Sequence, residues 1–322
     1  MSEVLGIGNA LVDVIIKLDS DRFLDDFNLP KGSMQLTDVD TAITIENACS
    51  GLSRSKASGG SAANTIHGLA RLGISTGFIG TVGHDDVGRF FHDDMVKAGI
   101  KPVLSISKTE TGRAISLVSQ DSERTFATYL GAAVEISEKS ISENIFKDYR
   151  ILHIEGYLAP SHQFMEKALK MAKKMHMQAS LDLASYNVVE SNRNFLQMII
   201  NRYVDIVFAN EEEAKAYTGL ANPEDALRKM ATPGKIVVVK TGKKGSLVNH
   251  NNKVCVIGIT PAKAIDTTGA GDLYASGFLY GLIKGFPIEK CGQAGALLAA
   301  NVIEEPGAKI SEKRWEIIRR SL

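Results

Sequence analysis

The sequence is short of the residues and runs that mark several protein classes. Its 322 residues include three cysteines, one tryptophan and eight prolines, and aromatic residues make up 7% of the chain. Three widely spaced cysteines without a CxxC pair argue against a disulfide framework or a zinc site, and predict buried or semi-buried thiols in a reducing cytoplasm. No apolar run approaches the roughly 18 residues of a membrane span. The first residues also lack a basic region followed by an apolar core, so we expect no secretory signal.

Neither sign of charge is in excess. Lys and Arg together number 37, and so do Asp and Glu, which gives a formal net charge of zero. A balanced chain gives no general reason to expect nucleic acid or a membrane as a partner. Hydrophobic residues make up 44% and charged residues 23%, as in soluble globular proteins. The composition therefore excludes a disordered chain, a collagen and a coiled coil.

Short apolar runs alternate with helix-like stretches along most of the chain. Most of these runs are continuous, which is typical of strands buried on both faces of a parallel sheet. The runs are 4–8, 77–82, 151–154, 204–208 and 236–239. Helical spacing of apolar residues follows in segments such as 163–175 and 211–217. This alternation predicts an α/β fold with a doubly wound, mostly parallel sheet and helices on both faces.

Two regions have a different period. Residues 112–130 read as two alternating strands joined by a polar turn at 120–123, and residues 12–17 and 32–37 could add further strands. Period-2 alternation indicates a sheet with one buried face and one wet face. We therefore predict a small β-sheet lid, inserted at 11–50 and 102–131. The main domain would consist of 1–10, 51–101 and 132–322.

The motif most suggestive of chemistry runs from Asp266 to Asp272 and reads DTTGAGD. Two glycines around an alanine leave backbone N–H groups uncovered at the start of an apolar helix, where the helix dipole favours an anion such as phosphate. Asp272 falls in the first turn, where a carboxylate could accept a proton from an attacking hydroxyl. The structural alternative is that Thr268 or Asp266 caps the helix and Asp272 is merely favourable there.

A second glycine-rich segment, Ser58 to Thr65, precedes a helix expected over 64–72. Gly59 and Gly60 would let the backbone approach a ligand closely, and the Asn64 amide can both donate and accept hydrogen bonds. Such a site suits a polyhydroxylated substrate. The alternative is a glycine-rich loop with an asparagine cap.

Polar residues also follow the ends of several expected strands. Asn9 and Asp13 follow the first strand, where Leu11 occupies the third glycine position of a dinucleotide-binding motif. Other polar sets follow later strands, namely Glu155, Asn210 with Glu213, and 241–245. Open α/β sheets bind ligands along the carboxyl edge of their strands. The repeated pattern therefore predicts one shared cleft, although each loop alone could simply be polar.

Together, the segments 59–64 and 266–272 resemble the two signatures of the ribokinase-like (PfkB) family of carbohydrate and nucleoside kinases. The segments most similar to bacterial adenosine kinases are 8–13, 29–34, 128–132, 155–158 and 204–211. The resemblance implies a Rossmann-like main domain with a β-sheet lid that closes over the substrate. It also implies ATP-dependent phosphorylation of a primary hydroxyl with Mg²⁺, and it leaves open a requirement for a monovalent cation.

The resemblance further implies a role for each matching residue. Asp272 is the expected general base, with an anion hole formed by Gly269, Ala270 and Gly271. The expected substrate-binding residues are Asn9, Asp13, Gly59, Gly60, Asn64 and Glu155. The expected nucleotide-binding residues are Asn210, Glu213, Thr241, Gly242, Gly245, Thr268 and Asn301. Magnesium is expected to be held through water near Asn210 and Glu213, with no direct protein ligand.

These features lead us to expect a kinase that converts adenosine to AMP, as a monomer or as a homodimer through the lid. The aromatic residues Phe126, Tyr129 and Tyr157 are candidates to hold the base, and Arg113 could meet a substrate phosphate. Three alternatives stay open. The first is a kinase that acts on ribose, on a fructose phosphate or on ketodeoxygluconate. The second is a non-catalytic sugar or nucleoside sensor, and the third is an NAD-dependent oxidoreductase. Leu11 counts against the last of these.

Overall fold

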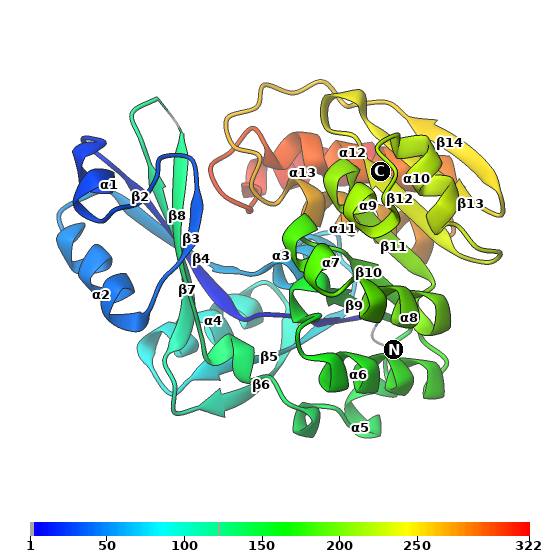
Figure 1. Ribbon diagram of the computed structural model, residues 1–322, viewed down its shortest axis with the longest axis horizontal. Coiled ribbons are helices and arrows are strands. Elements are labelled where there is room, and N and C mark those ends of the chain that lie inside the picture. The colour runs from blue at the N-terminus through cyan, green and yellow to red at the C-terminus, as the bar shows by residue number, and fades with distance from the viewer. Residues whose placement is uncertain (1–2, 122) are drawn as a thin grey trace.

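The chain folds around two sheets of unequal size, shown by a computed structural model that describes residues 3–121 and 123–322 (Figure 1). Met1 and Ser2, which belong to the segment searched for a secretory signal, and Ser122, in the expected turn, lie outside the described residues. Among the residues described, no helix is both long enough and apolar enough to span a bilayer. All three cysteines are free thiols, and Cys49 and Cys291 are buried.

The large sheet has nine strands in the order β14-β13-β12-β11-β10-β9-β1-β5-β6. Its strands are β1 (Val4–Ile7), β5 (Thr76–Gly83), β6 (Ile100–Ser107), β9 (Ile151–Glu155), β10 (Gln178–Asp182), β11 (Ile206–Asn210), β12 (Ile236–Lys240), β13 (Ser246–His250) and β14 (Lys253–Ile257). The pairs from β6 to β12 are parallel, and β13 and β14 add an antiparallel edge. The expected doubly wound, mostly parallel sheet is therefore confirmed.

Helices cover both faces of this sheet because its strands alternate between two cores. In β12, Ile236 and Val238 join one buried cluster, whereas Val237 and Val239 join the other. The first cluster packs under α3 (Ser61–Arg71), α4 (Asp86–Lys97), α11 (Ala270–Ile283) and α12 (Ile288–Val302). The second packs under α5 (Glu143–Phe146), α6 (His162–Lys174), α7 (Tyr186–Ser191), α8 (Arg193–Tyr203), α9 (Glu211–Thr218) and α10 (Pro223–Met230). The helix α13 (Glu312–Ser321) buries Trp315 in a third cluster.

The small sheet has five strands in the order β3-β8-β7-β2-β4. They are β2 (Leu11–Lys17), β3 (Met34–Leu36), β4 (Arg54–Gly59), β7 (Thr111–Val118) and β8 (Arg124–Gly131). Two helices, α1 (Arg22–Asp26) and α2 (Val39–Ala48), lie on the side of this sheet that faces away from the main body (Figure 1). The strands expected at 12–17, 32–37 and 112–130 are present.

The ranges expected for the lid differ from the sheets at two places. Residues 54–59 form β4 of the small sheet, although they fall in the range expected for the main domain. Residues 100–107 form β6 of the large sheet, although most of them fall in the range expected for the lid. Neither segment has the hydrophobic pattern expected of its sheet. Arg54–Gly59 is mostly polar or small and does not alternate, and β6 is interrupted by Pro102, which suits an edge strand.

Helix α11 carries the DTTGAGD motif at its start, and its buried aromatic residue Phe278 anchors it to the large sheet. The Phe278 ring meets Phe208 of β11 edge-on, with ring centres 5.5 Å apart at 86°. Substitution Phe278→Ala should lower the free energy of unfolding by about 3–5 kcal/mol, because it leaves a cavity between helix and sheet. Urea unfolding of the two proteins measures this loss. The exposed Ile317→Ala variant should change it by about 0.5 kcal/mol or less, and an equal effect of both variants would contradict the packing argument.

Candidate active site

The two glycine-rich segments of the sequence meet in space through one carboxylate. Asp272 lies in the first turn of α11, and its Oδ1 accepts a hydrogen bond from Ser61 Oγ at 2.8 Å. Its Oδ2 accepts another from Asn64 Nδ2 at 3.0 Å, and Thr65 Oγ1 donates to the Asp272 carbonyl at 3.1 Å. The start of α3 therefore fixes the Asp272 carboxylate, although the sequence separates Ser61 from Asp272 by 211 positions.

Asp266 organises the loop before α11. Its Oδ1 accepts from the backbone N–H of Thr268 at 3.0 Å and from the Thr268 hydroxyl at 2.7 Å. Its Oδ2 accepts from the backbone N–H of Gly307 and forms an ion pair with Arg124 at 2.8 Å. Because Arg124 belongs to β8, this ion pair joins the small sheet to the loop that precedes Asp272.

Gly269 begins α11 in a conformation that other residues rarely adopt. Its φ is +76°, and an added Cβ would lie 2.6 Å from the Cβ of Ala308. The backbone N–H of Ala270 donates to the Thr267 carbonyl at 3.2 Å. In a helix, the first N–H groups have no intrahelical acceptor, so in the described structure the free donors of this turn are those of Gly271 and Asp272.

On the other side of the carboxylate, Asp13 and Asn9 lie close to the glycines of the first motif. An added Cβ on Gly59 would be 2.1 Å from Asp13 Oδ1, and one on Gly60 would be 2.1 Å from the Asn9 carbonyl oxygen. Both positions therefore require glycine, because Asp13 and the Asn9 backbone come too close to leave room for a side chain. Glu155 is fully buried and accepts hydrogen bonds from the backbone N–H groups of Asn9 at 2.9 Å and Ala62 at 2.8 Å. Its carboxylate thus ties the segment that follows β1 to the start of α3.

Besides Arg124, two further basic residues that the sequence reasoning missed lie at this site. Lys309 Nζ is 3.4 Å from Asn64 Oδ1 and 3.5 Å from Ser58 Oγ, and burial lowers its pKa to about 8. Lys240 ends β12 and forms an ion pair with Asp182 at 2.8 Å. The sequence could have identified Lys240, because it is a single charged residue directly after the apolar run 236–239. Lys309 follows an irregular segment without any period, so no sequence pattern marks it.

Four carboxyl groups at this site have pKa values above the ordinary range, in each case chiefly because burial disfavours the charged form. The pKa of Asp272 is raised to about 6, with the Asp182 carboxylate adding to the effect and Ser61 and Asn64 opposing it. Burial also raises the pKa of Asp13 to about 6, and those of Glu155 and Glu213 to about 7. The cleft therefore gathers carboxylates that titrate close to neutral pH.

The residues expected to bind the nucleotide are only partly brought together. Asn210 and Glu213 form a capping box at the start of α9, in which Asn210 Oδ1 accepts from the Glu213 N–H at 2.8 Å. Residues 241–245 form the turn between β12 and β13, next to Lys240. The Asn301 amide donates to the Leu297 carbonyl at 2.9 Å and contacts Arg314 of α13 at 3.5 Å, so it is engaged by α12 and α13.

Alternation along β8 separates the aromatic and basic residues of the small sheet. Arg124 reaches Asp266, so Phe126, which shares its face, also faces the main body. Tyr129 lies on the opposite face, beside Arg113. Arg113 is bound there by Glu110 at 2.9 Å, and Glu46 of α2 lies at 3.7 Å. Of the lid residues considered, Phe126 therefore faces the cleft, whereas Tyr129 and Arg113 do not.

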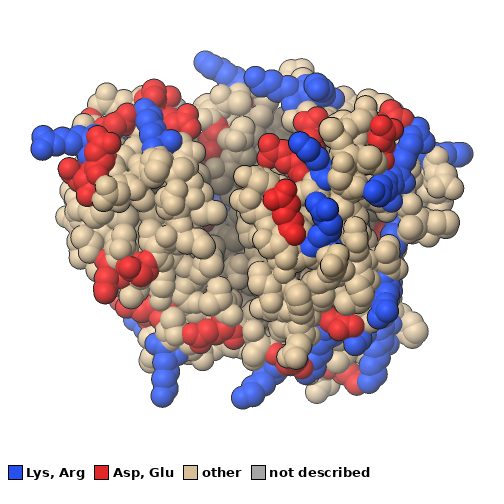
Figure 2. All heavy atoms as spheres, viewed as in Figure 1, with Lys and Arg blue, Asp and Glu red and all other residues tan. Residues whose placement is uncertain are grey.

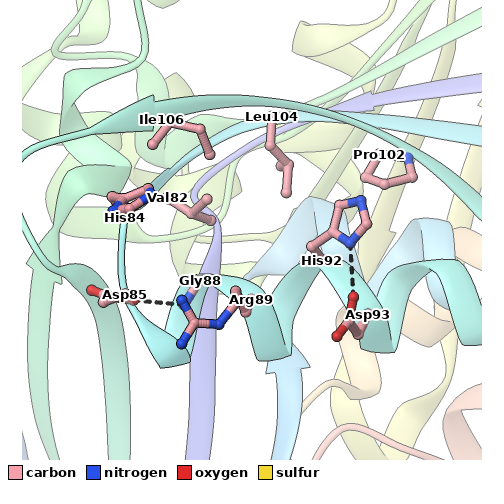
Figure 3. A pocket seen from close by; sticks show the side chains of 11 residues that line it. Val82, His84, Asp85, Gly88, Arg89, His92, Asp93, Pro102, Leu104 and Ile106 are labelled. Carbon is pink, nitrogen blue, oxygen red and sulfur yellow. Dashed lines mark hydrogen bonds and ion pairs between the residues drawn. The ribbon is translucent and has the colours of Figure 1, made fainter.

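The space between the two sheets is open to solvent. Figure 2 shows the surface hollowed between the lobe of the small sheet and the main body. A separate hollow of about 490 Å³ lies between α4 and β6, and its lining includes His84, Arg89, His92 and Ile106 (Figure 3). None of the expected site residues lines that second hollow.

Known proteins match this chain over most of its length. The profile of the pfkB family carbohydrate kinases matches residues 34–315. A 5-dehydro-2-deoxygluconokinase of Clostridium perfringens is 31% identical over 263 residues, which cover 76% of this chain and 78% of that protein. The crystal structure of adenosine kinase from Sinorhizobium meliloti superposes with a TM-score of 0.88 at 32% identity, covering 100% of this chain and 99% of that one. Adenosine kinase from Schistosoma mansoni in complex with 2-fluoroadenosine has a TM-score of 0.84 at 25% identity, covering 99% and 98%.

A doubly wound main sheet, a second small sheet and two glycine-rich helix starts around a carboxylate define a sugar or nucleoside kinase. The chain belongs to the pfkB family of carbohydrate kinases. It is a phosphotransferase, and the family implies that it uses ATP.

The raised pKa of Asp272 predicts that its ionisation lowers the free energy of unfolding as the pH rises. Because its folded-state pKa of about 6 exceeds the ordinary aspartate value of 3.8, its contribution to stability is present below pH 3.8 and is lost as the pH rises through 6. Asp272→Asn removes this titration. Relative to wild type, the variant should therefore gain about 2 kcal/mol in free energy of unfolding between pH 4 and pH 7.5. Urea unfolding at both pH values measures the gain, and a difference that does not change with pH would contradict a buried, titrating carboxylate.

Proposed function

We propose that this kinase transfers the γ-phosphoryl group of ATP to the 5′-hydroxyl of adenosine. The observation that carries the proposal is the Asp272 carboxylate, which Ser61 and Asn64 hold at the first turn of α11. In the proposed site, Asp272 faces the acceptor hydroxyl, and the N–H groups of Gly271 and Asp272 face the phosphoryl group. The small sheet acts as the lid.

In the proposed reaction, Asp272 accepts the proton of the acceptor hydroxyl as its oxygen attacks the γ-phosphorus. The bond to the bridging oxygen of ADP breaks, and its electron pair leaves with ADP. The backbone N–H groups at the start of α11 stabilise the charge on the transferred group. Asp13, Asn9 and Asn64 bind acceptor hydroxyls, and Gly59 and Gly60 allow the close approach. Glu155 holds Asn9 and Ala62 in place rather than touching the acceptor.

The nucleotide would lie along the turn that contains Thr241, Gly242 and Gly245, and Thr268 would flank the phosphates from the other side. Bound magnesium would neutralise phosphate charge, and it commonly keeps several waters and few protein ligands. This preference for water ligands fits Asn210 and Glu213, whose side chains hydrogen-bond each other and could reach the ion through water. We leave Asn301 out of the proposed nucleotide site because its amide is engaged by α12 and α13.

Two observations favour a neutral nucleoside as acceptor. The acceptor side carries the carboxylates of Asp13 and Asp272, whereas Arg113 and Arg124 are already paired with acidic residues. A phosphate on the substrate would meet net negative charge there. The face of β8 that looks toward the cleft also presents Phe126, beside the exposed Met34 of β3, and an apolar surface of this kind suits a base. The similar adenosine kinase structures agree with this choice.

A sugar acid is the second candidate acceptor. The Clostridium perfringens relative is named for 5-dehydro-2-deoxygluconate, and Lys309 offers an ammonium on the acceptor side. Lys309 contacts the neutral oxygens of Ser58 and Asn64 and has no carboxylate within ion-pair distance in the described residues, so its ammonium can meet one on a substrate. The two candidates thus differ in whether the base-binding surface or Lys309 selects the acceptor.

An acceptor screen separates these candidates. Purified protein is given ATP and Mg²⁺ with adenosine, other nucleosides, ribose, fructose 6-phosphate or 5-dehydro-2-deoxygluconate, and ADP release is measured. We expect kcat/KM for adenosine to exceed that for any sugar by about 100-fold or more, which is within the range that differential binding can supply. Phe126→Ala should raise KM for adenosine, and the matched control Phe23→Ala, on α1, should not. A preference for the sugar acid that is lost in Lys309→Met would replace the proposal by the second candidate.

Asp272 should control both the rate and its dependence on pH. We expect Asp272→Asn to lower kcat by about 10²–10⁴-fold, since that is the usual contribution of a general base, while ATP still binds. In wild type, kcat/KM should fall about tenfold per pH unit below pH 6, because the pKa of Asp272 is raised to about 6 and the protonated form accepts no proton. Steady-state rates from pH 5 to 8 measure this limb. Near-normal turnover of the variant, or a flat profile, would refute the assignment.

A further inference from the structure

Lys240 is a charged side chain at the centre of the candidate site without a part in the proposed reaction. It ends β12, and its Nζ donates to Oδ2 of Asp182, at the end of β10, at 2.8 Å. The Lys240 side chain is 16% exposed and that of Asp182 is 5% exposed. The pair therefore spans the carboxyl end of β11, which lies between these two strands.

The ammonium of Lys240 lies against the first turn of α11. An added Cβ on Gly271 would be 2.9 Å from Lys240 Nζ. The uncovered N–H groups of Gly271 and Asp272 thus lie beside a full positive charge. A helix start alone supplies only about half a charge. The combination suits a ligand with several negative charges, such as a polyphosphate, better than it suits a hydroxyl.

Lys240 keeps its charge in spite of its burial. Burial disfavours the ammonium, but the carboxylates of Asp182, Glu213 and Asp272 outweigh that effect and raise the pKa of Lys240 above its ordinary value. An ammonium has three N–H donors. In the part of the chain that the structure describes, one of them donates to Asp182. The other two are available to a ligand.

A purely structural role for the pair would be to join β10 to β12. These strands are already held through β11 by continuous parallel pairing, and a buried ion pair is a weak source of stability. Asp182 is instead built as a fixed support. Its Oδ1 accepts from the backbone N–H of Ala184 at 2.9 Å, and Ala184 adopts the left-handed region at φ +65°. Backbone strain of this kind is common where a side chain must be held for function.

We propose that Lys240 contacts the transferring γ-phosphoryl group and that Asp182 positions its ammonium. This inference rests on the proposed phosphoryl transfer. Lys240 donates hydrogen bonds to non-bridging oxygens of the γ-phosphate as the bond to ADP breaks and the bond to the acceptor oxygen forms. It gives up no proton, because the acceptor's proton passes to Asp272. Charge spread over these oxygens is what a phosphoryl-transfer site must stabilise.

The first test compares Lys240→Met with wild type in turnover and in nucleotide binding. We expect kcat to fall by about 100-fold or more, as for the loss of one preorganised donor. The Kd for the non-hydrolysable analogue AMP-PNP should rise about tenfold, whereas the Kd for ADP should change by about twofold or less, because ADP lacks the γ-phosphate. The matched control is Lys173→Met, which breaks another Lys–Asp pair, with Asp205 at 2.7 Å. Asp205 directly precedes β11, so this pair lies at the amino ends of the strands, away from the site. The control variant should leave all three quantities unchanged.

Asp182→Asn gives a second test, in which the affinity for AMP-PNP should not fall as it does in Lys240→Met. It removes an anion that competes with phosphate for Lys240, so AMP-PNP should bind as tightly as to wild type or more tightly, while kcat falls because the ammonium is less well held. If the pair only supports the fold, both variants should instead lower stability and weaken AMP-PNP and ADP alike. That result, or a kcat for Lys240→Met within about threefold of wild type, would overturn the inference. A wild type without activity on any acceptor would contradict the proposed function instead.

Discussion

The close approach of α3 and α11 is the constraint on which the site depends. A Cβ added to Gly68 of α3 would lie 2.4 Å from Ser276 Oγ of α11, so the two helices are in direct contact at this point. The Ser276 hydroxyl donates to the Thr65 carbonyl at 2.8 Å, across the same contact. Because both helices begin at glycine-rich loops, this contact sets the distance between the loops. A side chain in place of Gly68 would push the helices apart and draw Asp272 away from Ser61 and Asn64.

This arrangement disfavours the charged form of Asp272. Asp272 is desolvated and lies near other carboxylates, which raises its pKa toward neutrality. A carboxylate in water is a weak base, whereas one with a pKa near the working pH accepts a proton more readily. Lys240 and Lys309 supply compensating positive charge without forming an ion pair with Asp272 itself in the described residues. The site therefore keeps a basic carboxylate among cations that do not neutralise it directly.

Sequence reasoning reached the parts of this site that local patterns encode. Continuous apolar runs identified most of the central strands, and the two glycine-rich motifs identified the helix starts that meet at Asp272. It did not find Arg124, because its partner Asp266 lies far away in the sequence. It did not find Lys309, which no sequence pattern marks, and it passed over Lys240, although a single charge after an apolar run could have marked that residue. It also missed β4, because a strand of small and polar residues has no hydrophobic alternation to detect. Periodicity reports the burial of a segment, and it says nothing about which distant side chain completes a site.

The division between the two sheets also explains how similar relatives can act on different acceptors. The groups proposed for phosphoryl transfer, from Asp272 to Lys240, lie on the large sheet and its helices. The small sheet contributes Asp13 and Phe126, which we propose face the acceptor. It also contributes Arg124, which forms the only ion pair between the small sheet and the loop before α11 among the described residues. Substitutions on the cleft face of the small sheet can therefore change the acceptor without moving α3 or α11. Comparable identity to adenosine kinases and to sugar-acid kinases is what such a division of labour would produce.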